Sequence, residues 1–125
     1  MINYKASTYH QKRHSEFLQD RDLRLAWSYF ADRTYFSHVR SGDRVLDFGG
    51  GLGNNLLVVK ERADVVMLEL SDLGRKVANE DGIATVATPE ELKGRSFDTI
   101  LCRHVLEHVD DPKSVLETLR NKLSP

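Results

Sequence analysis

The feature that most constrains the fold is a run of glycines placed directly after a short apolar segment. Residues 44–48 read Arg-Val-Leu-Asp-Phe, and residues 49–53 read Gly-Gly-Gly-Leu-Gly. Glycine lets a chain turn sharply and bring its backbone close to a ligand, because no Cβ is in the way. A flexible linker would have neither the strand before it nor the helical pattern after it. The segment therefore predicts a strand that ends in a tight, ligand-binding loop.

The spacing of these glycines differs from the dinucleotide fingerprint G-x-G-x-x-G. Counted from Gly49, the last glycine of that fingerprint would fall on Asn54, and counted from Gly51 it would fall on Leu56. The pattern present is Asp-x-Gly-x-Gly-x-Gly, beginning at Asp47. An oxidoreductase of the NAD type is therefore a disfavoured alternative.

Apolar residues around the loop recur with the periods of strands and helices in alternation. Strands that alternate with helices form parallel sheets, and right-handed crossovers place the helices on both faces. The sequence thus predicts an α/β, Rossmann-like fold. The expected strands are 44–48, 65–68, 83–86 and 97–102. The expected helices are 15–39, 54–62, 71–80 and 112–123, with a short helical turn at 89–92. The expected core face of the first helix consists of Leu23, Ala26, Trp27 and Phe30.

Composition narrows the class of protein. The 125 residues fit one domain, and 40% hydrophobic residues suffice for a core. A net charge of −1 gives no overall attraction for nucleic acid or anionic membranes. The single cysteine, Cys102, allows neither an internal disulfide nor a cysteine-based zinc site, and we expect it to be a small buried side chain. With no apolar run of membrane-spanning length and no apolar leader, we expect a cytoplasmic protein without membrane or nucleic-acid partners.

The residues from Asp47 to Gly53 resemble motif I of the class I S-adenosylmethionine-dependent methyltransferases. Glu69 ends the second predicted strand, where that family holds the ribose hydroxyls of its cofactor. Residues 97–102 and the following His-Val-Leu-Glu-His-Val at 104–109 are similar to the family's fourth strand and the loop after it. The resemblance covers about residues 42–125. It implies S-adenosylmethionine as cofactor and methyl transfer to a small-molecule acceptor.

The resemblance also implies roles for individual residues. Asp47 would orient the cofactor's amino group, Glu69 would hold the ribose, and residues 102–104 would line the methyl-bearing side. Thr88 stands where the family often has an acidic residue against adenine, so Glu90 is an alternative contact there. The expected cofactor-binding residues are Asp47, Gly49, Gly50, Gly51, Gly53, Glu69, Leu70, Thr88, Glu90, Cys102, Arg103 and His104.

The histidine segment leaves several roles open. His104 and His108 are candidate general bases, because histidine titrates near neutral pH. Alternatively, His108 packs locally and His104 only faces the cofactor cleft. The segment also fits the H-x-x-E-H pattern of zinc hydrolases, which needs a well-formed helix. It approaches the Glu-x-x-Glu-His motif by which some methyltransferases hold magnesium, but His104 replaces an oxygen ligand there. We expect no metal.

The family's sheet has seven strands in the order 3-2-1-4-5-7-6, and this sequence supplies the first four, in the order 3-2-1-4. We expect a domain truncated after the fourth strand and its helix; the alternatives are a natural fragment and an oligomer in which another copy completes the sheet. The expected division is an arm and helix at 1–40, with Tyr4, Tyr9 and His10 as a lid or a tail, and the cofactor-binding domain at 41–125. An exposed fourth strand would promote pairing with another copy. A non-catalytic half-domain that binds cofactor or a partner is the alternative function.

Overall fold

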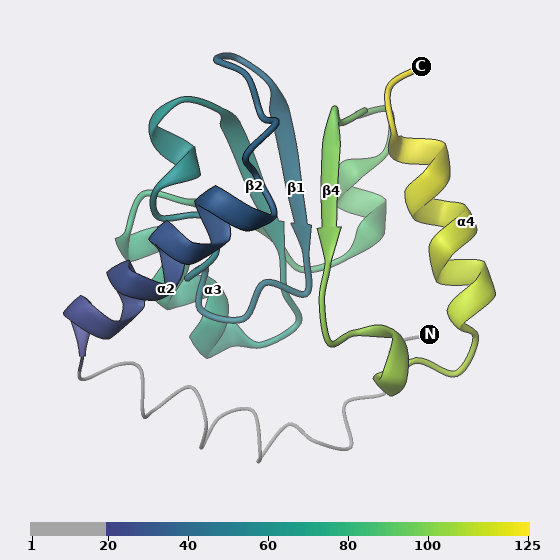
Figure 1. Cartoon of the computed structure of the whole chain (residues 1–125). Coiled ribbons are helices and arrows are strands. Elements are labelled where there is room, and N and C mark those ends of the chain that lie inside the picture. Colours follow the sequence, from purple (N-terminus) through teal and green to yellow (C-terminus); the bar gives the residue numbers. More distant parts are fainter. Residues whose placement is uncertain (1–19) are drawn as a thin grey trace.

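The computed structural model describes residues 20–125, whose strands form one parallel sheet (Figure 1). The expectation of a lid or tail at Tyr4, Tyr9 and His10 lies outside the described residues. The sheet has the order β3-β2-β1-β4, which confirms the predicted fold class and topology. Its strands are β1 (Arg44–Phe48), β2 (Asp64–Leu68), β3 (Ala84–Val86) and β4 (Thr99–Cys102).

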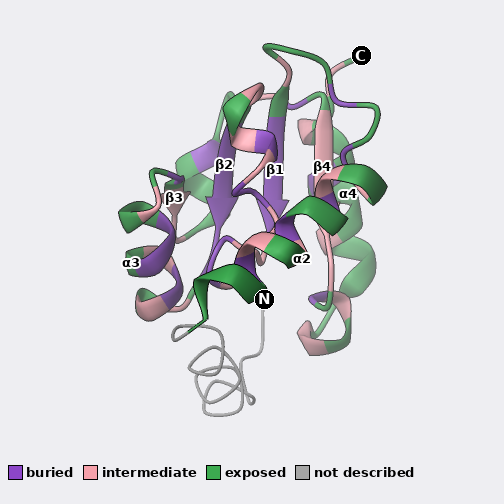
Figure 2. Cartoon of the chain, turned by 60° about the vertical axis from the view of Figure 1, so that its left-hand side comes forward, coloured by how far each residue is buried: buried purple, intermediate pink, exposed green. Residues whose placement is uncertain are grey.

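Both faces of the two central strands are buried, as is usual for parallel sheets (Figure 2). Side chains alternate between the faces, so Val45 and Met67 belong to one hydrophobic cluster and Leu46 and Val66 to the other. Because both sides need a cover, the apolar run of each strand is almost continuous. This burial holds the ends of β1 and β2 rigidly beside each other.

Helices cover both faces, as predicted. The helices α2 (Arg21–Thr34) and α3 (Asp72–Glu80) contribute Ala31 and Ala78 to the first cluster. On the other face, α4 (Pro112–Lys122) and the 3-10 turn η2 (Pro89–Leu92) contribute Leu119 and Leu92. Side-chain caps begin the three α-helices, with Asp20, Ser71 and Asp111 each accepting from a backbone N–H three residues on. Within residues 20–125, no helix is long and apolar enough to cross a membrane.

The predicted core face of the first helix is wrong. Leu23 and Phe30 are 48% and 49% exposed, whereas Arg24, Ser28 and Ala31 are buried. Polar contacts decide this orientation: Arg24 donates to Asn54 and pairs with Asp81, and the hydroxyl of Ser28 accepts from the loop backbone. Apolar periodicity cannot register such contacts, so it predicted a different face of the helix.

The first helix also ends earlier than predicted, at Thr34 rather than at residue 39, and the predicted start lies outside the described residues. After Thr34 the chain turns Phe36 fully into the core. The guanidinium of Arg62 then binds the carbonyl oxygens of Phe36 and Val39, at 2.7 and 3.1 Å, and pairs with Asp32. These contacts replace the helical hydrogen bonds that the predicted last turn would have made.

No α-helix spans residues 54–62, which corrects a second prediction. The segment is a series of turns that closes with the 3-10 helix η1 (Val59–Glu61). The N–H of Val58 donates to Ser28 Oγ at 2.9 Å instead of to a carbonyl in its own segment. The side chains of Asn54 and Asn55 bind α2, so this segment follows tertiary contacts that compete with helix formation.

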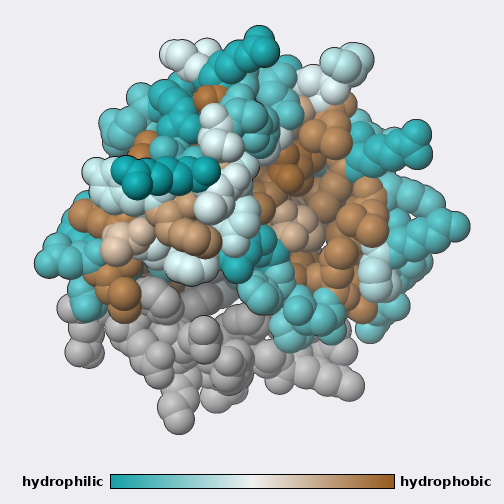
Figure 3. Space-filling view, viewed as in Figure 1, coloured by the Kyte–Doolittle hydropathy of each residue, from teal (hydrophilic) through white to brown (hydrophobic). Residues whose placement is uncertain are grey.

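In the described part of the chain, β4 pairs with β1 on one side only. It begins at Thr99, two residues later than predicted, because Phe97 forms a separate parallel bridge with Leu123. Figure 3 shows hydrophobic side chains gathered between β4 and α4. Leu116 of α4 is half exposed. Pairing of two copies through this edge stays a prediction.

Candidate functional site

The glycine loop lies at the carboxyl end of β1, and its glycines are required both by backbone shape and by packing. Gly49 and Gly53 have φ angles of 80° and 85°, a left-handed conformation that favours glycine. A Cβ on Gly49 would lie 2.3 Å from Cγ2 of Val105, and one on Gly53 would lie 2.8 Å from Cδ1 of Ile83. The loop is therefore a fixed, tightly packed turn, as predicted, and it brings bare backbone to the sheet edge.

Glu69 directly follows β2, and its buried carboxylate is tied to the glycine loop. Oε1 accepts from the N–H of Gly51 at 2.9 Å, and Oε2 accepts from the N–H of Ser71 at 2.7 Å. Each carboxylate oxygen can accept more than one hydrogen bond. Glu69 therefore fixes the loop against the start of α3 and still offers two acceptors to a ligand such as a diol. Leu70, the next residue, is partly exposed.

Gly74 in the first turn of α3 allows this helix to touch the glycine loop. A Cβ there would lie 2.4 Å from the carbonyl oxygen of Gly51 and 3.0 Å from Cγ of Glu69. Gly74 is not among the site residues predicted from the sequence. The only available signal was a glycine inside a predicted helix, which often marks a close approach.

Replacing Gly74 with alanine is expected to destabilise the protein by about 2 kcal/mol, as overpacking usually does. The test is whether the substitution lowers or raises the free energy of unfolding, because alanine in an exposed helix interior would stabilise the protein by about 1 kcal/mol relative to glycine. Urea unfolding measures the difference. Gly82→Ala is the comparison: its added Cβ meets no atom within 4 Å, so any loss there comes from its positive φ, which Gly74 does not share. A Gly74→Ala protein more stable than the wild type would contradict the contact.

Asp47, the fourth residue of β1, is buried, and its carboxyl group accepts from Nδ2 of Asn55 at 3.1 Å. Burial raises the pKa of Asp47 to about 7. The hydrogen bond from Asn55 and the charge of Arg103 lower this pKa, while the charge of Glu69 raises it. Asp47 is thus close to the balance between its neutral and charged forms at neutral pH. A cationic ligand group beside it would favour the charged form.

A hydrogen-bonded chain connects α2 to Asp47. Nε1 of Trp27 donates to Oδ1 of Asn55 at 2.7 Å, and Nδ2 of Asn55 faces Asp47. Because an indole N–H can only donate, it fixes which end of the Asn55 amide points toward the carboxyl group. Its helical spacing predicts Trp27 to be a core contact and does not indicate this polar role.

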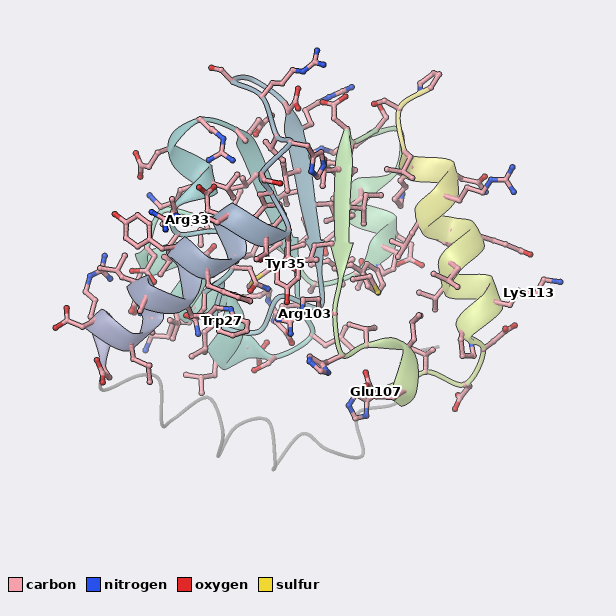
Figure 4. All side chains as sticks on the ribbon, viewed as in Figure 1. Trp27, Arg33, Tyr35, Arg103, Glu107 and Lys113 are labelled. Atoms are coloured by element: carbon pink, nitrogen blue, oxygen red, sulfur yellow. The ribbon has the colours of Figure 1, made fainter. Side chains whose placement is uncertain are left out.

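Arg103 and His104 follow β4 at the mouth of the site (Figure 4). The guanidinium carbon of Arg103 lies 5.1 Å from the centre of the Trp27 ring and 4.8 Å from that of Tyr35, which are cation–π contacts. His104 is exposed, with φ at 54°, and its Nε2 lies 3.3 Å from Nη2 of Arg103. The preceding Cys102 is half-buried, and this burial raises the pKa of its thiol.

The H-x-x-E-H segment lacks the helix that a zinc hydrolase would need. The backbone of His104 has a left-handed conformation, and residues Leu106–His108 form the short 3-10 turn η3. His104 and His108 therefore do not face one side of an α-helix. In the part of the chain that the structure describes, no group of three His, Cys, Asp or Glu side chains is arranged to hold a metal ion. The absence of a metal and the roles of the two histidines as bases stay predictions.

The predicted adenine contacts lie just beyond β3. Thr88 is the N-cap residue of η2, where Glu91 Oε2 accepts from the N–H groups of Ala87 and Thr88 at 2.7 and 2.8 Å. Both Thr88 and Glu90 are exposed, and their contact with adenine stays a prediction. A surface hollow of about 410 Å³ exists elsewhere, between α2, η1 and the end of α3. It contains none of the predicted cofactor-binding residues, so we place the candidate site at the glycine loop.

Comparison with known proteins gives consistent matches. A family model described as a methyltransferase domain matches residues 9–125. A ubiquinone biosynthesis O-methyltransferase from Idiomarina loihiensis is 30% identical over 95 residues, covering 67% of this chain and 39% of that protein. A tRNA 5-carboxymethoxyuridine methyltransferase from Escherichia coli is 35% identical over 98 residues, covering 66% of this chain and 36% of that protein. The chain thus spans well under half the length of these curated relatives.

Solved structures share the fold at lower identity. The plantazolicin methyltransferase in complex with SAH superposes with a TM-score of 0.61 at 23% identity, covering 96% of this chain and 48% of that one. A sugar N-methyltransferase from Streptoalloteichus superposes with a TM-score of 0.66 at 20% identity, covering 89% of this chain and 49% of that one. These similarities concern the arrangement of the sheet and its helices.

Proposed function

Because the chain belongs to the methyltransferase domain family, we propose that its protein transfers the methyl group of S-adenosylmethionine to a small-molecule acceptor. The observation that carries the proposal is the pairing of Glu69 with the glycine loop, through Gly51 N–H at 2.9 Å. It sets a buried carboxylate beside bare backbone at the carboxyl ends of parallel strands, where such sheets bind ligands.

The residues present fit this cofactor. The glycine loop leaves room for close approach, Glu69 would accept hydrogen bonds from the ribose hydroxyls, and Asp47 would accept one from the amino group. When bound, S-adenosylmethionine supplies a methyl group on a positively charged sulfur, which is a strong electrophile. The protein's main task is then to align the acceptor, methyl group and sulfur. His104 or His108 would take a proton from an acceptor that must lose one.

That the acceptor is a small molecule is the more specific part of the proposal. Ubiquinone biosynthesis and sugar N-methylation appear in the names of two similar proteins, while one relative is named for a tRNA nucleoside. A net charge of −1 gives no overall attraction for RNA, which favours a small acceptor. The single cysteine accords with a reducing, cytoplasmic location. The alternative is a half-domain that binds the cofactor without transferring its methyl group.

Calorimetric titration with S-adenosylhomocysteine tests the cofactor, with NAD as the comparison ligand. We expect S-adenosylhomocysteine alone to bind. Glu69→Gln should weaken this binding about 10-fold or more, because an amide loses charged acceptor capacity toward the ribose. Glu61→Gln is the matched control, since Glu61 is an exposed residue that pairs with Lys60. Unchanged affinity in Glu69→Gln would remove Glu69 from the site, and binding of NAD alone would contradict the cofactor.

The acceptor class is tested with S-adenosylmethionine that carries a radioactive methyl group. The protein is incubated with a cell extract separated by size, and label is expected in the small-molecule fraction. Label confined to RNA would overturn the small-molecule acceptor. Binding of S-adenosylhomocysteine without transfer to any fraction would favour the half-domain.

A further inference from the structure

Arg103 differs from the other arginines that are withdrawn from solvent. Four arginines in residues 20–125 are buried or half-buried: Arg24, Arg62, Arg75 and Arg103. The first three each pair with an aspartate. Within the same residues, no ion pair joins Arg103 to a carboxylate. A half-buried guanidinium that has no carboxylate in direct contact is suited to bind an anionic ligand group.

The surroundings of Arg103 leave its hydrogen-bonding edge available. The rings of Trp27 and Tyr35 lie against the guanidinium, and Nη2 lies 3.3 Å from Nε2 of His104. A guanidinium binds a carboxylate through the N–H groups on its edge, and this contact is compatible with ring stacking. The two rings therefore hold Arg103 in place without using up its ability to bind an anion.

Arg103 and Asp47 lie at the same edge of the sheet. Cys102, which precedes Arg103, is the register partner of Phe48, which follows Asp47. The guanidinium is close enough to contribute to the electrostatic environment of Asp47. An acidic and a basic side chain at the same edge of the sheet complement a zwitterion, and the amino-acid end of S-adenosylmethionine carries both an ammonium and a carboxylate.

The segment that follows the glycine loop does not provide a helix N-terminus for a carboxylate. The N-terminus of an α-helix presents free N–H groups to anions, and the sequence predicted such a helix at residues 54–62. The structure has turns there, and the N–H of Val58 is already donated to Ser28. Arg103, which follows the neighbouring strand β4, supplies a cation at this edge of the sheet where a helix N-terminus is missing.

We propose that Arg103 binds the α-carboxylate of S-adenosylmethionine while Asp47 receives its ammonium group. This inference rests on the proposed function and adds to it the means by which the amino-acid end is recognised. Trp27 and Tyr35 act as positioning residues, because they hold the guanidinium but do not contact the ligand in this arrangement.

The test compares two ligands that differ in one group. Affinities for S-adenosylhomocysteine and for its analogue without the carboxylate are measured by calorimetry. Arg103→Met, which keeps an unbranched side chain between the rings, should bind S-adenosylhomocysteine about 30-fold more weakly, as expected for loss of a charge-assisted contact. Its affinity for the decarboxylated analogue should equal that of the wild type. Arg103→Lys should recover part of the loss, since it restores charge but not the planar fork.

Arg33→Met is the matched control, because Arg33 is an exposed arginine on α2 (Figure 4). It should leave both affinities unchanged. An equal loss for both ligands in Arg103→Met would show that Arg103 only supports the fold, and no loss for either would show that it takes no part; each result overturns the inference. If the wild type binds neither ligand, the cofactor proposal itself fails. If it binds both equally well, only the carboxylate contact fails.

Discussion

Replacing Asp47 with asparagine is expected to stabilise the fold at pH 8 and to leave its stability at pH 4 nearly unchanged. The pKa of this buried carboxyl group is about 7 in the folded protein, against 3.8 in its ordinary state. Between these values the folded protein holds a proton that the unfolded chain has lost, so the contribution of Asp47 to stability falls as pH rises. With about 1.4 kcal/mol for each pKa unit, the gain at pH 8 is on the order of 4 kcal/mol.

Urea unfolding of wild type and Asp47→Asn across pH 4 to 8 measures this difference. Subtracting the two curves removes the contributions of other groups, such as Glu61, Glu91 and Asp98, whose pKa values are lowered by hydrogen bonds in the fold. Asp64→Asn is the control, since Asp64 is exposed at the start of β2. A difference between wild type and Asp47→Asn that does not grow with pH would show that Asp47 is charged throughout. The same substitution should weaken cofactor binding, because an amide does not attract an ammonium group.

The second large effect is expected from Asp81, which neutralises the buried Arg24. The two side chains are only 12% and 8% exposed, and Nη2 of Arg24 contacts Oδ2 of Asp81. Asp81→Asn would leave a buried guanidinium without its charge partner, which typically costs about 3–5 kcal/mol. The loss should appear as a lower urea midpoint with an unchanged slope.

Arg21 and Arg24 both pair with Asp81, so comparing their substitutions separates the effect of burial on stability from the effect of the ion pair itself. Arg21 binds the same carboxylate at 3.1 Å, but its side chain is 63% exposed, so Arg21→Met should change stability little. The double variant Arg24→Met with Asp81→Asn should be more stable than Asp81→Asn alone, because no unpaired charge remains buried. If the double variant loses as much stability as the single variants Arg24→Met and Asp81→Asn lose together, the two side chains are not electrostatically coupled and the explanation is wrong.

Much of the fold could be predicted because its signals are local. The apolar runs at β1 and β2, the Ser71 cap of α3 and the proline that opens α4 each specify an element within a few residues. The glycine loop was predicted for the same reason. Its left-handed positions are a property of the backbone, which only a few residue types tolerate.

The predictions are wrong where contacts between residues distant in the sequence determine the local structure. The orientation of α2 follows from Arg24 meeting Asp81, and the missing helix at 54–62 follows from Ser28 capturing the N–H of Val58. Neither pairing leaves a periodic trace in the sequence. The contact of Gly74 with the glycine loop is of the same kind, because a helical glycine reveals its purpose only when the opposing backbone is known.

The position of Trp27 has a practical consequence. It is the single tryptophan of the sequence, and it joins Asn55 by a hydrogen bond and Arg103 by a ring contact. The indole emission of the protein thus arises from one place, at the mouth of the candidate site. Its colour and intensity depend on the polarity and charge around that ring, so the chain carries a built-in optical reporter. Events at the glycine loop can be followed in real time without attaching a dye or altering a residue.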